Sequence, residues 1–298
     1  MVTKGPNTLG IDIGGTKLKA IALSNKSDIL KELSIPSRAD QGPNFVREAV
    51  QEAVHIFQEA GIKFSGIGIG CAGSVDHHAG VVRNSPNFAH WSNVPLRDWI
   101  QSDFKVPVAV ENDAKCAVYS EWKVGAGKGC KNLVLLTLGT GIGGGLILDG
   151  RLFRGATGTA GELGHLSIHT EGIPCPCGNQ GCFERYCSAT AVKNQAKGVS
   201  PKEVFSKASI VPEYKKIIEE FIFNFQVALV GIANMFDPEV ILLGGAVTDG
   251  LSIYLDKISE HVKSHAFPAV GANLSIKTTQ FKNLSGSLGA ALLVREYI

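Results

Sequence analysis

The stretch Ile11-Asp12-Ile13-Gly14-Gly15-Thr16-Lys17 places an apolar strand before a short turn of glycine and threonine, and a second apolar strand follows at 18–23. The arrangement returns in Leu136-Thr137-Leu138-Gly139-Thr140-Gly141-Ile142-Gly143, with its second strand expected at 145–149. Two copies of one hairpin in a single chain predict two related domains, each offering a glycine-rich turn to a ligand.

Apolar strands and amphipathic helices alternate along the rest of the chain, which is typical of α/β proteins with mixed sheets. Further strands are predicted at 66–70, 107–110, 132–138, 240–244 and 274–280, and helices at 43–60, 94–104, 112–124, 201–208, 213–236, 249–265 and 284–297. We expect an N-terminal domain over 1–115, completed by the C-terminal helix 284–298 because chain ends tend to lie close together. The second domain is expected over 116–283.

The bulk composition is that of an ordinary globular protein. Of 298 residues, 44% are hydrophobic and 19% charged, and 29 basic against 27 acidic residues leave a net charge of +2. We find no basic block that would track nucleic acid, no apolar run long enough for a bilayer, and no apolar core of a signal peptide at the N-terminus. Seven cysteines, an odd number, favour a reducing cytoplasm over disulfides. The expected partner is a small molecule, with neither nucleic acid nor membrane.

A loop at 165–182 has the composition of a structural zinc site. Cys175, Cys177 and Cys182 supply three thiolates, and His165 is the favoured fourth ligand, with His169 and Cys187 as alternatives. Four protein ligands leave no open position for water, so the predicted role of zinc is to stabilise the loop.

Two acidic residues bracket these ligands. Glu162 lies beside His165, and Glu184 follows Cys182. A metal that only stabilises a loop does not need flanking acids, so we expect the loop to present Glu162, His165 and Glu184 to a hydroxylated ligand.

The first glycine turn suits a phosphate. Gly14 and Gly15 let backbone N–H groups converge on an anion, and Thr16 and Lys17 add a hydroxyl and a charge. Asp12 would act in the outer sphere of a Mg²⁺ bound to that phosphate. The alternative is a plain hairpin turn.

The second turn, with Gly139, Thr140, Gly141 and Gly143, matches the dinucleotide pattern G-x-G-x-x-G. A nicotinamide site needs a helix next, whereas a strand is predicted here, so we expect a second phosphate-binding hairpin. Gly244 and Gly245 follow the apolar run 240–243 and would let adenine or ribose approach the backbone; a simple strand-to-helix turn is the alternative.

The segment Glu111-Asn112-Asp113 precedes a predicted helix, where Asn or Asp commonly caps the N-terminus. The functional alternative makes Asp113 a general base that takes a proton from a substrate hydroxyl, while Asn112 orients that substrate.

Taken together, these motifs resemble the ROK family of sugar kinases, repressors and open reading frames over nearly the whole chain. The family's catalytic motif is present as Glu111-Asn112-Asp113-Ala114, and its metal motif as Glu162-x-x-His165 followed by Cys175-x-Cys177-Gly178-x-x-Gly181-Cys182-x-Glu184. Two departures are visible: Ala72 stands where many members have proline, and Lys115 where many have asparagine. We expect Lys115 to lie outside the sugar pocket.

The resemblance implies a two-domain fold of the actin-like ATPase/hexokinase (ribonuclease H-like) type, which binds ATP with Mg²⁺ and commonly forms homodimers. It implies transfer to the 6-hydroxyl of a hexose, with Asp113 as base and glucose as the first-choice substrate. The sugar contacts that it implies are Gly73, Asn112, Glu162, His165 and Glu184. N-acetylglucosamine or N-acetylmannosamine kinase activity is the alternative within the enzymes, and a sugar-responsive regulator is the alternative outside them. Polyphosphate is a less favoured donor.

Overall fold

The computed structural model describes residues 6–85, 88 and 90–298. Contacts between residues divide the chain into two compact units. Unit 1 contains the described residues up to Val124 together with Arg154–Ala160 and Asn283–Ile298, and unit 2 contains Gly125–Phe153 and Gly161–Lys282.

Unit 1 is built on a five-stranded sheet with the order β3-β2-β1-β4-β8. Its strands are β1 (Thr8–Ile13), β2 (Lys17–Leu23), β3 (Ile29–Pro36), β4 (Ile67–Cys71) and β8 (Val108–Asn112). The first three are antiparallel neighbours, and β1, β4 and β8 run parallel. A small second sheet contains β5 (Ser74–Asp76), β6 (Val81–Asn84) and β7 (Ser92–Val94).

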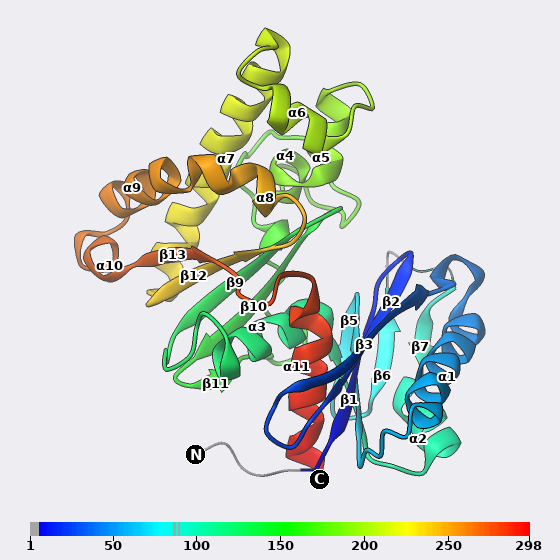
Figure 1. The fold of residues 1–298 in the computed structure, drawn as a ribbon. Coiled ribbons are helices and arrows are strands. Elements are labelled where there is room, and N and C mark those ends of the chain that lie inside the picture. Colours follow the sequence, from blue (N-terminus) through cyan, green and yellow to red (C-terminus); the bar gives the residue numbers. More distant parts are fainter. Residues whose placement is uncertain (1–5, 86–87, 89) are drawn as a thin grey trace. The chain divides into compact units, whose positions relative to one another are not determined.

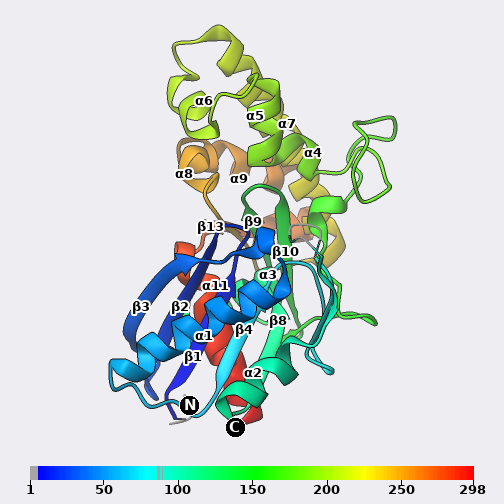
Figure 2. The same cartoon turned by 90° about the vertical axis from the view of Figure 1, so that its right-hand side faces the viewer.

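Helices cover both faces of this sheet (Figures 1 and 2). On one side lie α1 (Pro43–Glu59) and α2 (Leu96–Phe104), and on the other α3 (Asp113–Val124) and α11 (Ser285–Leu293). Successive side chains of a strand point to opposite faces of the sheet, so the helices on the two sides contact different strand residues. Leu9, Ile11 and Ile13 pack in the core with α1, whereas Gly10, on the opposite face, meets α11.

Glycines bring α11 close to the sheet. A Cβ atom at Gly10 would overlap the Ser287 carbonyl, and one at Gly68 would overlap the Ala290 carbonyl. Residues of the chain's last segment therefore lie directly against β1 and β4, and Asp12 lies on this same face of β1.

Unit 2 repeats the same sheet topology, with the order β11-β10-β9-β12-β13. Its strands are β9 (Leu133–Leu138), β10 (Ile142–Leu148), β11 (Arg151–Leu152), β12 (Val240–Gly244) and β13 (Ser275–Thr278). Here too an antiparallel hairpin leads into two parallel pairings. The repeat predicted from the two glycine turns is therefore confirmed.

Helix α7 (Pro212–Phe236) is the main helix of the unit 2 core. Its Phe221, Phe225 and Leu229 are buried with Leu136 and Leu243 of the sheet. By length and composition this helix could cross a membrane, but 56% of its most apolar 18-residue stretch is buried inside the protein. The core helix of a globular protein has the same properties, so the length and composition of α7 are weak evidence for a membrane span. The other helices of this unit are α4 (Glu184–Cys187), α5 (Ala189–Gln195), α6 (Pro201–Lys207), α8 (Thr248–Leu251), α9 (Leu255–His265) and α10 (Pro268–Asn273).

Several predicted bounds and elements differ from the structure. Strand β10 begins at Ile142, which pairs with Leu138, so Gly143 lies in the strand opposite Thr137 and not in a turn. The predicted domain boundary after residue 115 falls inside α3, and unit 1 continues to Val124 because α3 packs along α11. The helix predicted at 249–265 is interrupted by the 3-10 turn η3 (Ser252–Tyr254).

Candidate active site

The register of unit 1 aligns the chemistry-bearing residues at one edge of its sheet. Asp12 pairs with Gly70, and Gly70 with Glu111, across three parallel strands. The carboxyl ends of these strands lead into the 14–17 turn, the Gly73 loop and α3. Ligands of open α/β sheets bind at this edge, outside the carboxyl ends of the strands.

Asp12 and Asp113 are both partly buried at this edge. A Cβ at Gly70 would lie 3.6 Å from the Asp113 Cα, so the start of α3 lies over β4. Desolvation, together with the charge of Asp113, raises the pKa of Asp12 to about 7, against the opposing charge of Lys19. Desolvation also raises the pKa of Asp113, while the Ala114 N–H and Lys115 oppose the rise. The edge therefore holds two carboxylates that water solvates poorly.

The side chain of Asn112 both caps α3 and binds a neighbouring loop. Its Oδ1 accepts a hydrogen bond from the Lys115 N–H (3.1 Å), and its Nδ2 donates to the Gly73 carbonyl (3.1 Å). The capping alternative is confirmed for Asn112. One N–H of the carboxamide is not used by the Gly73 bond, so capping does not exclude a contact to a substrate. Lys115 itself is buried within unit 1.

The structure separates glycines that the fold requires from glycines that it does not. Gly73 has φ +109°, and its Cβ would overlap the Asn84 carbonyl; Gly245 has φ +92° and lies equally close to Leu138. At Gly15 and Gly139, a Cβ would meet nothing within 4 Å among the described residues. Packing therefore does not explain glycine in either turn, whereas the close approach of a ligand would.

The second turn is held by α4 and α5 within unit 2. The Gly139 carbonyl accepts from the Ala189 N–H (2.8 Å), and the Thr140 carbonyl from the Thr190 hydroxyl (2.7 Å). Glu184 Oε2 accepts a hydrogen bond from the Ile142 N–H (3.3 Å), and a Cβ at Gly141 would lie only 2.7 Å from this oxygen. Gly244 ends β12 beside Thr279.

The predicted zinc ligands come together in unit 2. The ligand atoms of His165, Cys175, Cys177 and Cys182 all lie within 4.8 Å of one another. Cys175 Sγ lies 3.7 Å from His165 Nδ1, and Cys177 Sγ lies 3.7 Å from Cys182 Sγ. Tetrahedral zinc with ordinary Zn–S and Zn–N bonds separates its ligands by about 3.6–3.8 Å. The cluster therefore fits zinc.

The two alternative ligands are occupied elsewhere. His169 Nε2 lies 2.7 Å from the Asn224 Oδ1, and the Cys187 thiol donates to the Phe221 carbonyl. Burial is the main reason that the pKa of Cys182 rises to about 12, and the neighbouring thiols add to the rise. A bound cation would stabilise the thiolate form that this environment disfavours.

The acidic residues of the loop differ in position. Glu184 Oε1 lies 3.8 Å from Cys175 Sγ and 3.9 Å from His165 Nδ1, so this side chain contacts both the cluster and the second glycine turn. Glu162 is exposed and precedes the 3-10 turn η2 (Leu163–His165). The Nδ1 atom of His165 faces the thiols, which leaves Nε2 on the other side of the ring.

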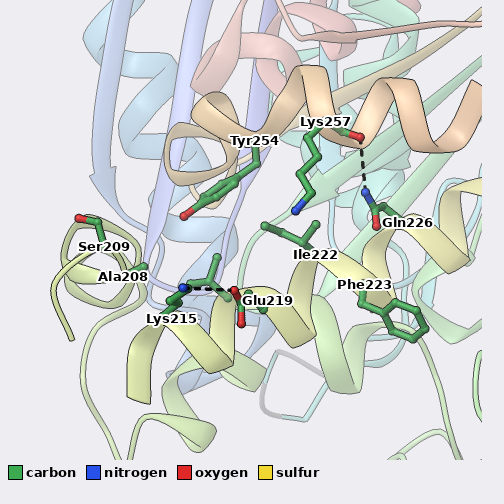
Figure 3. Close-up of a pocket in the computed structure, with 10 residues that line it drawn as sticks. Ala208, Ser209, Lys215, Glu219, Ile222, Phe223, Gln226, Tyr254 and Lys257 are labelled. Carbon is green, nitrogen blue, oxygen red and sulfur yellow. Dashed lines mark hydrogen bonds and ion pairs between the residues drawn. The ribbon is translucent and has the colours of Figure 1, made fainter. Parts of the chain in front are cut away.

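A cavity of about 530 Å³ lies elsewhere in unit 2, between α7, η3 and α9 (Figure 3). Ile222, Gln226, Tyr254 and Lys257 line it. None of the predicted site residues does, so this cavity is separate from the candidate site.

Sequence reasoning missed one contact at the candidate site. Arg154 Nε donates to Glu111 Oε2 at 2.6 Å. A single arginine in a loop, 43 positions from its partner, carries no local pattern that identifies this pairing.

Comparison with known proteins places the chain in a class of sugar kinases and regulators. A profile described as the ROK family matches residues 8–297, so the chain belongs to the ROK family. It is similar to a glucokinase of Streptomyces coelicolor, with 32% identity over 97% of this chain and 98% of the relative. It is also similar to a xylose repressor of Bacillus spizizenii, with 28% identity over 99% of this chain and 78% of the repressor.

A solved structure gives the same picture of the fold. The ROK family glucokinase from Streptomyces griseus, in complex with glucose and AMPPNP, superposes with a TM-score of 0.85 and 30% identity, over 97% of this chain and 99% of that chain. The expected fold class, a mixed α/β fold of the hexokinase-like kinases, is confirmed.

The raised pKa of Asp12 predicts a pH-dependent gain in stability for Asp12→Asn. Because the pKa is higher in the folded than in the unfolded chain, ionisation of Asp12 costs stability as the pH rises from about 4 through 7. One pKa unit corresponds to about 1.4 kcal/mol, so we expect Asp12→Asn to stabilise the ligand-free protein by roughly 2–4 kcal/mol at pH 8 and little at pH 4. Urea unfolding at both pH values measures this. The exposed Asp98→Asn is the control, and an equal effect of Asp12→Asn at both pH values would contradict the assignment.

Proposed function

We propose that this protein is an ATP-dependent hexose kinase that phosphorylates the 6-hydroxyl of glucose. The observation that carries the proposal is the placement of Asp113 and Asp12 at the carboxyl edge of one sheet, beside a turn whose Gly15 is not required by packing. Membership of the ROK family and similarity to glucokinases support it.

In this proposal Asp113 accepts the proton of the sugar hydroxyl. A partly buried carboxylate with a raised pKa is a stronger base than one in water, which suits proton abstraction near neutral pH. Mg²⁺, held through Asp12, would spread charge off the transferred phosphoryl group. Much of the rate gain would come from positioning the hydroxyl against the phosphate.

The remaining predicted residues divide by ligand. The sugar hydroxyls are assigned to Gly73, Asn112, Glu162, His165 and Glu184. The phosphates are assigned to the first turn (Gly14, Gly15, Thr16 and Lys17) and to the second turn (Gly139, Thr140 and Gly141) with Gly143 at the start of β10, and the nucleoside to Gly244 and Gly245.

The test is an ADP-release assay across glucose, mannose, N-acetylglucosamine and N-acetylmannosamine, with ATP or polyphosphate as donor. We expect turnover with ATP and glucose, and a roughly 10²–10⁴-fold lower kcat for Asp113→Asn, the usual share of a general base. Asp98→Asn is the matched control, with the same change at an exposed site.

Each other outcome has a distinct meaning. Sugar binding without ADP release would mean that the protein is a sugar-responsive regulator and not an enzyme. The similarity to a xylose repressor makes this the leading alternative. Preference for an N-acetyl sugar would contradict the proposal that glucose is the substrate. Near-normal turnover of Asp113→Asn would overturn the assignment of the base.

We also propose that His165, Cys175, Cys177 and Cys182 bind one structural zinc ion per chain in the cytoplasm, where the cysteines stay reduced. Their separations suit tetrahedral zinc, and all seven cysteines are free thiols. Because Cys177 is exposed, replacing it tests the metal more than core packing.

For Cys177→Ser we expect less than one zinc per chain and a melting temperature lower by about 4 °C or more, which corresponds to a loss of 1–2 kcal/mol. Metal analysis and calorimetry measure both. Cys130→Ser, outside the cluster, should change neither. Absence of zinc from the unaltered protein would remove the metal from the proposal.

A homodimer is proposed on the basis of an apolar face of α7. Phe223 and Val227, four residues apart, are exposed on one face of this helix, and Met235 is exposed near its C-terminal end. We expect Phe223→Glu to give a monomer in sedimentation equilibrium at micromolar concentration, whereas Ile253→Glu, at another exposed apolar position, leaves a dimer. A monomeric unaltered protein would disprove the dimer.

A further inference from the structure

The segment Arg154–Ala160 leaves unit 2 after Phe153, joins unit 1, and returns at Gly161. Its ends are tied together, because the Ala160 N–H donates to the Arg154 carbonyl (3.0 Å). Gly158 has φ +83°, and a Cβ there would lie 2.7 Å from the Val75 carbonyl of β5. The segment is therefore packed closely against unit 1 and carries one charged side chain, Arg154, into it.

Arg154 meets the carboxylate of Glu111, whose side chain is almost entirely buried. Arg154 Nε donates to Glu111 Oε2 at 2.6 Å, and the side chains are 22% and 4% exposed respectively. The other oxygen, Oε1, accepts the N–H of Asn112 at 3.0 Å. Both oxygens of this carboxylate therefore have a donor, and one of the two is a cation.

The backbone held by Glu111 leads directly into the candidate base. Asn112, whose N–H Glu111 binds, joins the Gly73 carbonyl to the first turn of α3 through its own side chain. Asp113 is the next residue. A change in the Glu111 carboxylate would therefore be transmitted to the end of β8, the Gly73 loop and the start of α3.

We infer that Arg154 and Glu111 are a positioning pair for the phosphoryl transfer. Arg154 compensates the buried charge of Glu111, and Glu111 fixes the backbone that carries Asn112 and Asp113. The inference rests on the proposed kinase function for its kinetic consequence, whereas the hydrogen-bonded arrangement itself can be tested without turnover.

The two partners are not equivalent. Removing Arg154 leaves a buried carboxylate without its cation, which is costly, whereas removing the charge of Glu111 leaves an arginine that still reaches water. Arg154→Met should therefore be more harmful than Glu111→Gln, which retains an oxygen able to accept the Asn112 N–H. In the double variant no buried charge remains unpaired, so it should recover activity relative to Arg154→Met.

The kinetic experiment measures kcat and both KM values for these variants and for Arg154→Lys. We expect Arg154→Met to lower kcat by about 10–100-fold, since misplacement of a reacting group by about 1 Å costs up to that much. The KM for sugar should rise because Asn112 and Gly73 shift, while the KM for ATP stays within about threefold. Arg154→Lys restores the charge without the Nε geometry and should recover part of kcat.

Arg47→Met is the matched control. Arg47 pairs with Asp103 in the same unit, with Arg47 Nε 2.9 Å from Asp103 Oδ2, and joins α1 to α2 away from the candidate base. Its loss should lower stability and leave kcat and both KM values unchanged. Normal kcat for Arg154→Met, or a double variant no better than this single one, would overturn the inference.

Hydrogen exchange gives the readout that does not depend on activity. In Arg154→Met, the amides of Asn112 and Lys115 should exchange faster than in the unaltered protein and in Arg47→Met, because the acceptors Glu111 Oε1 and Asn112 Oδ1 move. Unchanged exchange at both amides would overturn the positioning pair, even if the protein proved to have no kinase activity. Absence of ADP release from the unaltered protein would instead overturn only the proposed function.

Discussion

The close approach of α11 to the sheet is the contact on which the candidate site of unit 1 depends. It creates the buried environment of the Asp12 carboxylate. Gly10 and Gly68 have no side chains on the face where α11 lies, and Gly286 at the start of α11 allows the helix to pass directly over the Asp12 carboxylate. A Cβ at Gly286 would lie 2.8 Å from the Asp12 Cγ. The same packing that buries the sheet therefore removes water from the carboxylate, and this desolvation is the main cause of its raised pKa.

A second carboxylate at the same edge makes the arrangement less stable without ligand. Asp113 is close enough for its charge to raise the pKa of Asp12, and its own pKa is raised by burial. Nearby cations oppose this only in part, through Lys19 at Asp12 and Lys115 at Asp113. Such a site exists because the large apolar core of the unit stabilises the fold around it, and a ligand that brings positive charge would relieve the repulsion.

Much of the fold could be predicted because its strands are apolar and its glycine turns repeat. The failures have physical causes. Strand β3 is an edge strand whose side chains are at most half-buried, and β5, β6 and β7 are only three or four residues long, so these unpredicted strands give a weak apolar signal. The start of β10 was misplaced because Gly143-Gly144-Gly145 has the composition of a turn, whereas pairing with β9 makes it a strand. Cysteine spacing predicted the three thiols of the cluster but left His165, His169 and Cys187 as alternatives for the fourth position. In the structure a ring nitrogen of His165 lies with the thiols, whereas His169 and Cys187 form hydrogen bonds elsewhere. No local pattern joins Arg154 to Glu111.

In unit 2, one carboxylate contacts both the cluster of three cysteines and His165 and the second glycine turn. Glu184 directs Oε1 toward Cys175 and His165, while its Oε2 accepts the Ile142 N–H at the first residue of β10. A Cβ at position 141 would lie 2.7 Å from the Oε2 atom, so the carboxylate would have to shift away from this position if residue 141 had a side chain. The glycine that the sequence assigns to a phosphate turn thus also leaves room for the Glu184 carboxylate beside Ile142. A change in the cluster that moved Glu184 would remove a hydrogen-bond acceptor from the turn, so the position of the loop that carries the cysteines and the shape of the turn are set together.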